Sequence, residues 1–248
     1  MSVTVPAAQA ERARAIMIEL FPEGFEEVGQ DGGVELAAYT DPAGEERLWA
    51  AFGGARSNHV EEGWEDRWRA FHRPVRIGPL WVGPPWEEPD ADVIAVVIDP
   101  GRAFGTGSHA TTRLGLELLL DQPRGSLLDV GCGSGVLAIA AAKLGFDPVY
   151  AVDVDPQAIE ATNANAGVNG VTITASVADA LSDPLPAAEC AVMNVSLEHD
   201  GAVAERLECA RLITSGYLVS ESPEYPGFRR EARRAAEGWA ADLHIRTK

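Results

Sequence analysis

The stretch SLLDVGCGSGVLAIAAAKLG, residues 126–145, decides the fold of this chain. It begins with an apolar run of strand length, passes through the glycine-rich turn GCGSG, and continues as an apolar helix that Gly145 ends. A glycine-rich turn between a strand and a helix is where an open α/β sheet binds its ligands. The stretch therefore predicts one βα unit of a parallel sheet, with a ligand site at its turn.

The chain after Pro74 alternates between strands and helices, which is typical of a parallel sheet covered by helices on both faces. Asp155 and Pro156 mark a helix start, as N-cap and first helical residue. Strands are expected at 93–98, 126–130, 149–154, 171–177, 189–195 and 216–221, with a last edge strand at 241–248. Because only 28 residues follow Ser220, we expect one edge strand to be missing or abbreviated.

The N-terminal part of the chain is expected to be a separate small α+β domain. Residues 1–57 predict a strand at 2–5, a helix at 10–21, two short strands around the DGG at 31–33, and a helix at 45–52. Trp64, Trp68 and Phe71 share one helical face, which predicts a linker helix at 58–73. Residues 74–248 then form the larger domain.

Charge is the strongest signal in the composition. The 248 residues carry 20 Lys and Arg against 38 Asp and Glu, a net charge of −18 that repels nucleic-acid backbones. Nine acidic and no basic residues lie from Glu19 to Glu46, which favours either a basic macromolecular partner or a merely solvated surface. No apolar run reaches membrane-span length and no signal peptide is visible, so we expect no membrane contact and a cytoplasmic location.

Two acidic residues follow the glycine turn at the spacing of a nucleoside site. Asp153 lies 22 residues after Gly131, at the end of the next strand, where a carboxylate can accept both hydroxyls of a ribose. The turn is GxGxG rather than the GxGxxG of dinucleotide-binding proteins, which disfavours a pyrophosphate ligand. Asp179 follows the third strand, where it either meets an adenine edge or is simply a loop carboxylate.

A second stretch, DPGRAFGTGSHATT at residues 99–112, narrows the interpretation. Together with LLDVGCGSGVLAIAAAKLG and VDVDPQAIEATNANAGVNGV, it resembles class I S-adenosylmethionine-dependent methyltransferases, and among them the PrmA family, which methylates the eleventh protein of the large ribosomal subunit. The resemblance covers residues 61–180 well. It implies a Rossmann-like α/β methyltransferase domain behind the small α+β domain, with S-adenosylmethionine as cofactor.

The resemblance also assigns site residues. Thr112, which we expect to open a helix, Gly131, Asp153 and Asn194 stand where the family binds the cofactor, and Asn194 lies beside the transferred methyl group as the candidate catalytic residue. A loop that covers the cofactor contains Phe104, Thr106 and His109. Asp129, Gly133 and Asp179 complete the candidate cofactor-binding set.

Methyl transfer from a sulfonium is a direct displacement, which requires alignment of the acceptor and exclusion of water but no metal. An acceptor lysine must be neutral, and the oxygens of Asn194 could hold its neutral form by hydrogen bonds. After Asn194 the chain reads VSLEHD, where the family usually has an apolar run. Glu198 and His199 either begin the next helix or face the acceptor and take a proton.

The partner implied by the resemblance is a basic ribosomal protein, bound by a monomeric enzyme that does not contact nucleic acid. Two alternatives stay open at this point. The same fold could methylate another protein or a small molecule, or it could bind the cofactor without turnover. A nucleic-acid methyltransferase is disfavoured by the charge and by NVSL, which lacks the paired prolines of adenine methyltransferases.

Overall fold

The computed structural model describes residues 2–6, 9–21, 25–30, 33–38, 42–52, 73–100, 107–195 and 200–247. The chain divides into two compact units, residues 1–67 and 68–248, and each is described by itself. Trp64, Trp68 and Phe71 of the expected linker helix lie outside the described residues.

The N-terminal unit is a three-stranded antiparallel sheet with two helices. Its elements are β1 (Ser2–Pro6), α1 (Ala10–Leu20), β2 (Glu26–Gln30), β3 (Gly33–Ala37) and α2 (Pro42–Phe52), and the strand order is β1-β3-β2. Met17, Leu36 and Leu48 are fully buried where the helices meet the sheet. These are the elements that the sequence predicts, although α2 begins three residues earlier than expected.

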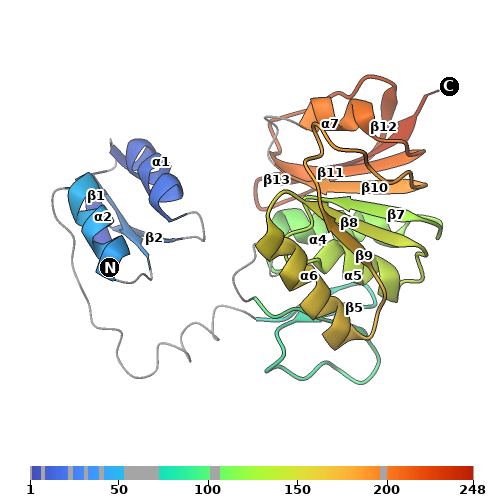
Figure 1. Ribbon diagram of the computed structural model, residues 1–248, viewed down its shortest axis with the longest axis horizontal. Coiled ribbons are helices and arrows are strands. Elements are labelled where there is room, and N and C mark those ends of the chain that lie inside the picture. The colour runs from blue at the N-terminus through green and yellow to red at the C-terminus, as the bar shows by residue number, and fades with distance from the viewer. Residues whose placement is uncertain are drawn as a thin grey trace. The chain divides into compact units, whose positions relative to one another are not determined.

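The C-terminal unit is built on a seven-stranded sheet of order β12-β13-β11-β10-β7-β8-β9 (Figure 1). The neighbouring strands from β11 to β9 pair in parallel, and β13 and β12 add to β11 as an antiparallel hairpin. The strands are β7 (Leu127–Val130), β8 (Val149–Asp153), β9 (Thr174–Val177), β10 (Cys190–Asn194), β11 (Arg211–Leu218), β12 (Phe228–Ala236) and β13 (Trp239–Arg246). This mixed α/β sheet is the predicted fold class.

Helices cover both faces of this sheet because alternate strand residues point to opposite sides. Leu127 packs with α4 (Ala110–Leu120), α5 (Val136–Lys143) and α6 (Pro156–Asn169), whereas its neighbour Leu128 packs with α7 (Asp200–Arg206). A small sheet of β4 (Val75–Ile77), β5 (Leu80–Gly83) and β6 (Ile94–Val97) joins the first of these cores. Among the helices that the structure describes, none has the length and apolar character needed to cross a membrane.

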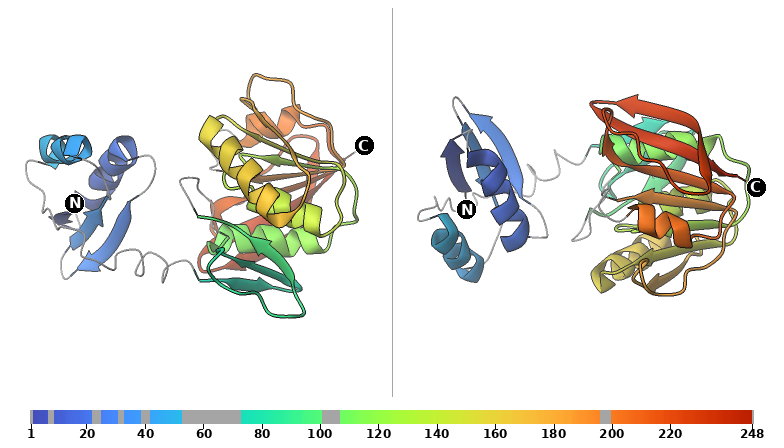
Figure 2. Two further views of the ribbon diagram at one scale, coloured as in Figure 1. Left: turned by 60° about the horizontal axis from the view of Figure 1, so that its bottom comes forward. Right: turned by 90° about the horizontal axis from the view of Figure 1, so that it is seen from above.

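The C-terminal tail corrects three sequence expectations. β11 begins at Arg211 rather than at residue 216, and no edge strand is missing, since β12 and β13 form the red pair of strands in Figure 2. The segment at 241–248 is mostly interior strand, because β12 lies outside it. What is short is the connection 219–227, which joins β11 to β12 without a helix. β12 escaped prediction because its four arginines suit an exposed edge rather than an alternating apolar strand.

Candidate functional site

The candidate site lies at the carboxyl edge of the large sheet, where three neighbouring parallel strands end together. Val130 of β7 pairs with Val152 of β8 on one side and with Met193 of β10 on the other. The next residues along these strands are Gly131, Asp153 and Asn194. The topology therefore brings together three residues that the sequence analysis singled out.

The turn after β7 requires glycine for steric reasons. Gly131 and Gly133 have φ angles of 72° and 52°, in the left-handed region that side chains disfavour. A Cβ atom at Gly131 would also lie 2.6 Å from Cγ1 of Val195. The N–H groups of Gly131 and Cys132 both donate to the carbonyl oxygen of Val152, at 2.8 and 3.1 Å. The turn thus exposes backbone at the strand ends, where a ligand can approach it closely.

The carboxylate of Asp153 is fixed by two backbone hydrogen bonds. Its Oδ2 accepts from the Gly133 N–H at 2.9 Å, and its Oδ1 accepts from the Asp155 N–H at 3.0 Å. Each carboxylate oxygen can accept a second hydrogen bond. The side chain is therefore oriented in advance and keeps acceptor capacity for a pair of hydroxyl groups.

Asp129 is a buried carboxyl group beneath the glycine turn. Its Oδ2 accepts from the Ala138 N–H at 3.0 Å, whereas its Oδ1 has no hydrogen-bond partner among the described residues. The pKa of Asp129 is raised to about 7, mainly by burial; the hydrogen bond from Ala138 opposes this shift and the nearby charge of Asp153 adds to it. A buried acceptor with a free oxygen fits a cationic or hydrogen-bond-donating ligand.

Asn194 and Thr112 meet in the structure although 82 residues separate them. The Asn194 side-chain amide donates from Nδ2 to Oγ1 of the buried Thr112 at 3.3 Å. Thr112 lies in the first turn of α4 rather than opening it, because His109 is the N-cap and Ala110 the first helical residue. The bond turns the NH₂ group of Asn194 toward the helix and leaves its amide oxygen as the acceptor.

His109 contacts both the first turn of α4 and strand β13. Its Nδ1 accepts from the Thr111 N–H at 3.4 Å, and its ring meets Trp239 edge to face, with centroids 5.0 Å apart. Burial, and then the charge of Arg113, lowers the pKa of His109. This shift favours the neutral ring, which accepts a hydrogen bond at the helix N-terminus.

The hairpin contact to His109 was not predicted from the sequence. Glu237 forms an ion pair with Arg113 of α4 at 2.6 Å, and the following residues bring Trp239 against the histidine. Glu237 and Gly238 form the hairpin turn with φ angles of 54° and 81°. Asn-Gly or Asp-Gly would have signalled such a turn, whereas Glu-Gly does not.

Of the remaining predicted site residues, the structure describes Asp179, which lies in the loop that follows β9. The Asp179 carboxylate accepts hydrogen bonds within its own turn, from the Leu181 N–H at 2.9 Å and from the Ser182 hydroxyl at 3.0 Å. These bonds fix the carboxylate within its loop, and its contact with an adenine edge stays a prediction. Phe104 and Thr106, together with Glu198 and His199, lie outside the described residues.

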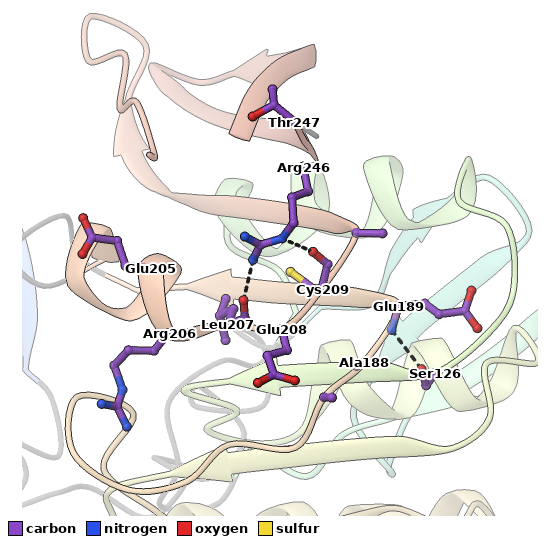
Figure 3. A pocket seen from close by; sticks show the side chains of 12 residues that line it. Ser126, Ala188, Glu189, Glu205, Arg206, Leu207, Glu208, Cys209, Arg246 and Thr247 are labelled. Carbon is purple, nitrogen blue, oxygen red and sulfur yellow. Dashed lines mark hydrogen bonds between the residues drawn. The ribbon is translucent and has the colours of Figure 1, made fainter. Parts of the chain in front are cut away.

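A separate hollow lies at the opposite edge of the sheet, near the first residues of β7, β10 and β11 (Figure 3). Arg246 crosses it and donates to the backbone carbonyls of Leu207 and Cys209, which follow α7. Its guanidinium thereby satisfies carbonyl groups at the end of a helix. Among the described residues, none that the sequence analysis assigned to a ligand lines this hollow.

Comparison of the sequence with known proteins identifies one family. The family model described as ribosomal protein L11 methyltransferase (PrmA) matches residues 37–218. The ribosomal protein L11 methyltransferase of Legionella pneumophila (strain Philadelphia 1) is 39% identical over 198 residues, covering 73% of this chain and 68% of that protein. Its counterpart in Shewanella pealeana is 35% identical, with 88% of each chain covered.

Solved structures agree with the sequence comparisons. The ribosomal protein L11 methylase of Lactobacillus delbrueckii subsp. bulgaricus has 28% identity and a TM-score of 0.63, covering 71% of this chain and 100% of that one. A tRNA (uracil-54, C5)-methyltransferase of Pyrococcus abyssi, solved with S-adenosyl-L-homocysteine, shares the fold at 18% identity and a TM-score of 0.50, covering 70% and 44%. The chain belongs to the family of ribosomal protein L11 methyltransferases, whose class I fold uses S-adenosylmethionine as methyl donor.

Proposed function

We propose that this chain transfers methyl groups from S-adenosylmethionine to amino groups of ribosomal protein L11. The observation that supports this most directly is the Asn194–Thr112 hydrogen bond, which orients an amide oxygen at the edge where the glycine turn and Asp153 also lie. Relatives of this chain carry that activity in their names. When bound, the cofactor supplies an electrophilic methyl group on a sulfonium.

The residues at the carboxyl edge suit that cofactor. Asp153 would accept the two ribose hydroxyls, since its carboxylate is already oriented by Gly133 and Asp155. Gly131 and Gly133 would admit the methionine part close to the backbone, above the unpaired oxygen of Asp129. Phe104, Thr106, His109, Thr112 and Asp179 complete the proposed contact set.

Asn194 is the proposed catalytic residue because an amine must lose its proton before it attacks. A lysine in water has a pKa of about 10.4, and removal from water lowers it. The amide oxygen of Asn194 would accept an N–H of the neutral amine and point its lone pair at the methyl group. Thr112 acts through Asn194 by fixing the amide orientation, so it is a positioning residue in this role.

The partner in this proposal is a basic protein rather than a nucleic acid. The net charge of −18 and the run of acidic residues in the N-terminal unit favour basic surfaces and repel phosphates. We propose that the N-terminal unit presents the substrate, that the enzyme acts as a monomer, and that it works in the cytoplasm, where ribosomal proteins are assembled.

Purified L11 incubated with this protein and labelled S-adenosylmethionine is expected to gain methyl groups on amino nitrogens. Mass spectrometry of L11 would identify the residues and the number of methyl groups on each. A complete absence of incorporation, under conditions where binding of the cofactor is demonstrated, would contradict the proposal. In a second assay, a cell lysate replaces purified L11. If another protein in the lysate is labelled and L11 is not, the methyl-transfer chemistry stands but the acceptor is a different protein.

Asp153→Ala is expected to weaken cofactor binding roughly 10- to 100-fold, because hydrogen bonds to a charged group contribute about 1.5–3 kcal/mol. Isothermal titration calorimetry would measure the dissociation constant. Glu160→Ala, which removes an exposed carboxylate from α6, serves as the matched control and should bind as the wild type does. Equal affinities for Asp153→Ala and the wild type would refute the ribose assignment.

Thr112→Val is expected to lower kcat about tenfold by freeing the Asn194 amide, whereas Thr112→Ser keeps the hydroxyl and should recover most of the rate. A double-mutant cycle tests whether the hydroxyl acts through the amide. If it does, the double variant Thr112→Val with Asn194→Ala is no slower than Asn194→Ala alone. Additive losses in kcat would show that the two side chains act independently.

Asp129 gives a prediction about pH, because its pKa of about 7 lies well above the ordinary 3.8. Its ionised form attracts the cationic cofactor, so wild-type affinity should rise as pH increases from 6 to 7.5. Without cofactor, folding stability should fall as pH rises from about 4 to about 7, since the unfolded chain ionises first. Asp129→Asn should therefore be more stable at pH 8, by roughly 1–3 kcal/mol, and should bind cofactor weakly with a flat pH profile.

Calorimetric titrations and thermal unfolding at several pH values would measure both effects of Asp129→Asn. Asp92→Asn, at an exposed turn, is the control and should reproduce the wild-type curves. The same pH profile of cofactor affinity in Asp129→Asn and the wild type would exclude Asp129 as the titrating group.

A further inference from the structure

The residues at the carboxyl ends of four neighbouring strands form one row across the large sheet. Asp153, Gly131 and Asn194 stand at the same level at the ends of β8, β7 and β10. The row continues to Ser215 of β11, which pairs directly with Asn194. Because neighbouring strands are about 4.8 Å apart, Ser215 lies beside the proposed catalytic amide, on the side away from Asp153.

The hydroxyl group of Ser215 is buried and unpaired. Ser215 is 2% exposed, and its Oγ has no hydrogen-bond partner among the described residues. The hydroxyl of Thr214, on the opposite face of the same strand, bonds with the Tyr217 hydroxyl at 2.9 Å and with Nε2 of His244 at 3.2 Å. Since buried polar side chains are usually hydrogen-bonded, the unpaired hydroxyl at Ser215 calls for a functional explanation.

The side chain of Asn194 carries a group that complements this hydroxyl. Its NH₂ group has two hydrogens to donate, and one of them goes to Oγ1 of Thr112 at 3.3 Å. Thr112 is the one acceptor for Nδ2 within the part of the chain that the structure describes. The second hydrogen is therefore available to a hydroxyl oxygen nearby.

The NH₂ group of Asn194 and the Ser215 hydroxyl lie against the same face of α4. Thr112 and Gly115 are three positions apart, so they share a face of that helix. Thr112 bonds with Asn194, and a Cβ atom at Gly115 would lie 3.7 Å from Oγ of Ser215. Both polar groups thus lie in one layer between helix and sheet, where rotation of Ser215 about χ1 can turn its Oγ toward Nδ2 of Asn194.

A close backbone approach holds β11 beside β10 at this level. Gly216 has a φ of 108°, and a Cβ atom there would lie 2.4 Å from the Val195 carbonyl oxygen. A larger residue at this position would push β11 away from the chain that follows Asn194. Gly216 therefore keeps Ser215 and Asn194 side by side.

We propose that Ser215 is a second positioning residue for Asn194, so that during methyl transfer the amide donates one hydrogen to Thr112 and the other to Ser215. The proposal rests on the proposed function. As the amine nitrogen bonds to the methyl carbon and the sulfur–carbon bond breaks, positive charge moves from sulfur to nitrogen. The hydrogen bond from the amine N–H to the Asn194 oxygen strengthens at that stage. An amide that donates both hydrogens is fixed in orientation and is a stronger acceptor.

Ser215→Ala removes the hydroxyl and tests this role. Its kcat on L11 should fall about 3- to 10-fold, whereas the KM for L11 and the cofactor dissociation constant should stay within about twofold of the wild type. Its thermal unfolding midpoint should equal or exceed that of the wild type, because an unpaired buried hydroxyl does not stabilise the fold. In an Asn194→Ala background, Ser215→Ala should cause no further loss, which single-turnover rates with excess enzyme would measure.

Thr214→Val is the matched control, since it removes the hydroxyl of the adjacent residue on the opposite face and keeps the side-chain shape. It should lower the thermal unfolding midpoint, because it breaks the bonds with Tyr217 and His244. Its kcat on L11 should stay within about twofold of the wild type. The two variants therefore separate catalysis from stability in opposite directions.

Each outcome decides the question. Wild-type kcat in Ser215→Ala, or a further loss in the Asn194→Ala background, would overturn the role of Ser215. An equal fall of kcat in Thr214→Val would also overturn it, since the effect would then be general to β11. No incorporation into L11 by the wild type would end the proposed function and this role with it, whereas equal turnover by the wild type and Ser215→Ala would end this role alone.

Discussion

The hydrogen bond from the Gly133 N–H to the carboxylate of Asp153 is the contact on which the site depends. It joins the glycine turn of one βα unit to the strand end of the next. It can form only because β7 and β8 are parallel neighbours in register, with Val130 opposite Val152. The buried cores on both sides of the sheet hold that register. A one-residue slip would turn every apolar side chain of β8 to the wrong face and carry Asp153 away from the turn.

The part of the candidate site formed by the glycine turn and Asp153 could be predicted from local sequence alone. The glycine turn, the N-cap Asp155 and the strand-end Asp153 each follow from residues within one βα unit, and the structure has them where the motif predicts. The Thr112–Asn194 pair could not be derived from spacing, because only the order of strands in the sheet brings positions 82 residues apart together. Resemblance to a family supplied both residues, but neither their mutual bond nor its direction.

The helix α6 shows how a segment with no predicted ligand role can connect the two diagnostic motifs. Asn165 accepts from the Asp99 N–H at 3.0 Å and donates to the Ser134 carbonyl at 2.9 Å. Asn169 pairs with both the N–H and the carbonyl of Val97, as a neighbouring strand would. One helix therefore ties the glycine turn to the first residue of the stretch at 99–112. The sequence NANAGVN predicts a helix but does not show what its amides bind, because those partners lie more than 30 positions away.

The C-terminal strands β12 and β13 differ most from the sequence prediction. The reason is that charged residues, rather than an alternating apolar pattern, hold β12 against β13. With no helix between β11 and β12, the face of β13 carries a fully buried Asp242, which accepts a hydrogen bond from Tyr217 at 3.0 Å. A buried carboxylate needs cations nearby, and Arg230 and Arg233 of β12 supply them at 3.7 and 3.6 Å.

The other two arginines of β12 are also paired within the chain, Arg229 with Glu231 and Arg234 with Asp121. The densest basic segment of this acidic protein is thus used to complete its own fold. The sequence of β12 suggests a basic surface. In the structure each of its four guanidinium groups already faces a carboxylate, so the strand offers little free positive charge to a phosphate backbone. The excess negative charge therefore lies on the rest of the surface, and it is this charge that supports the proposal of a basic partner.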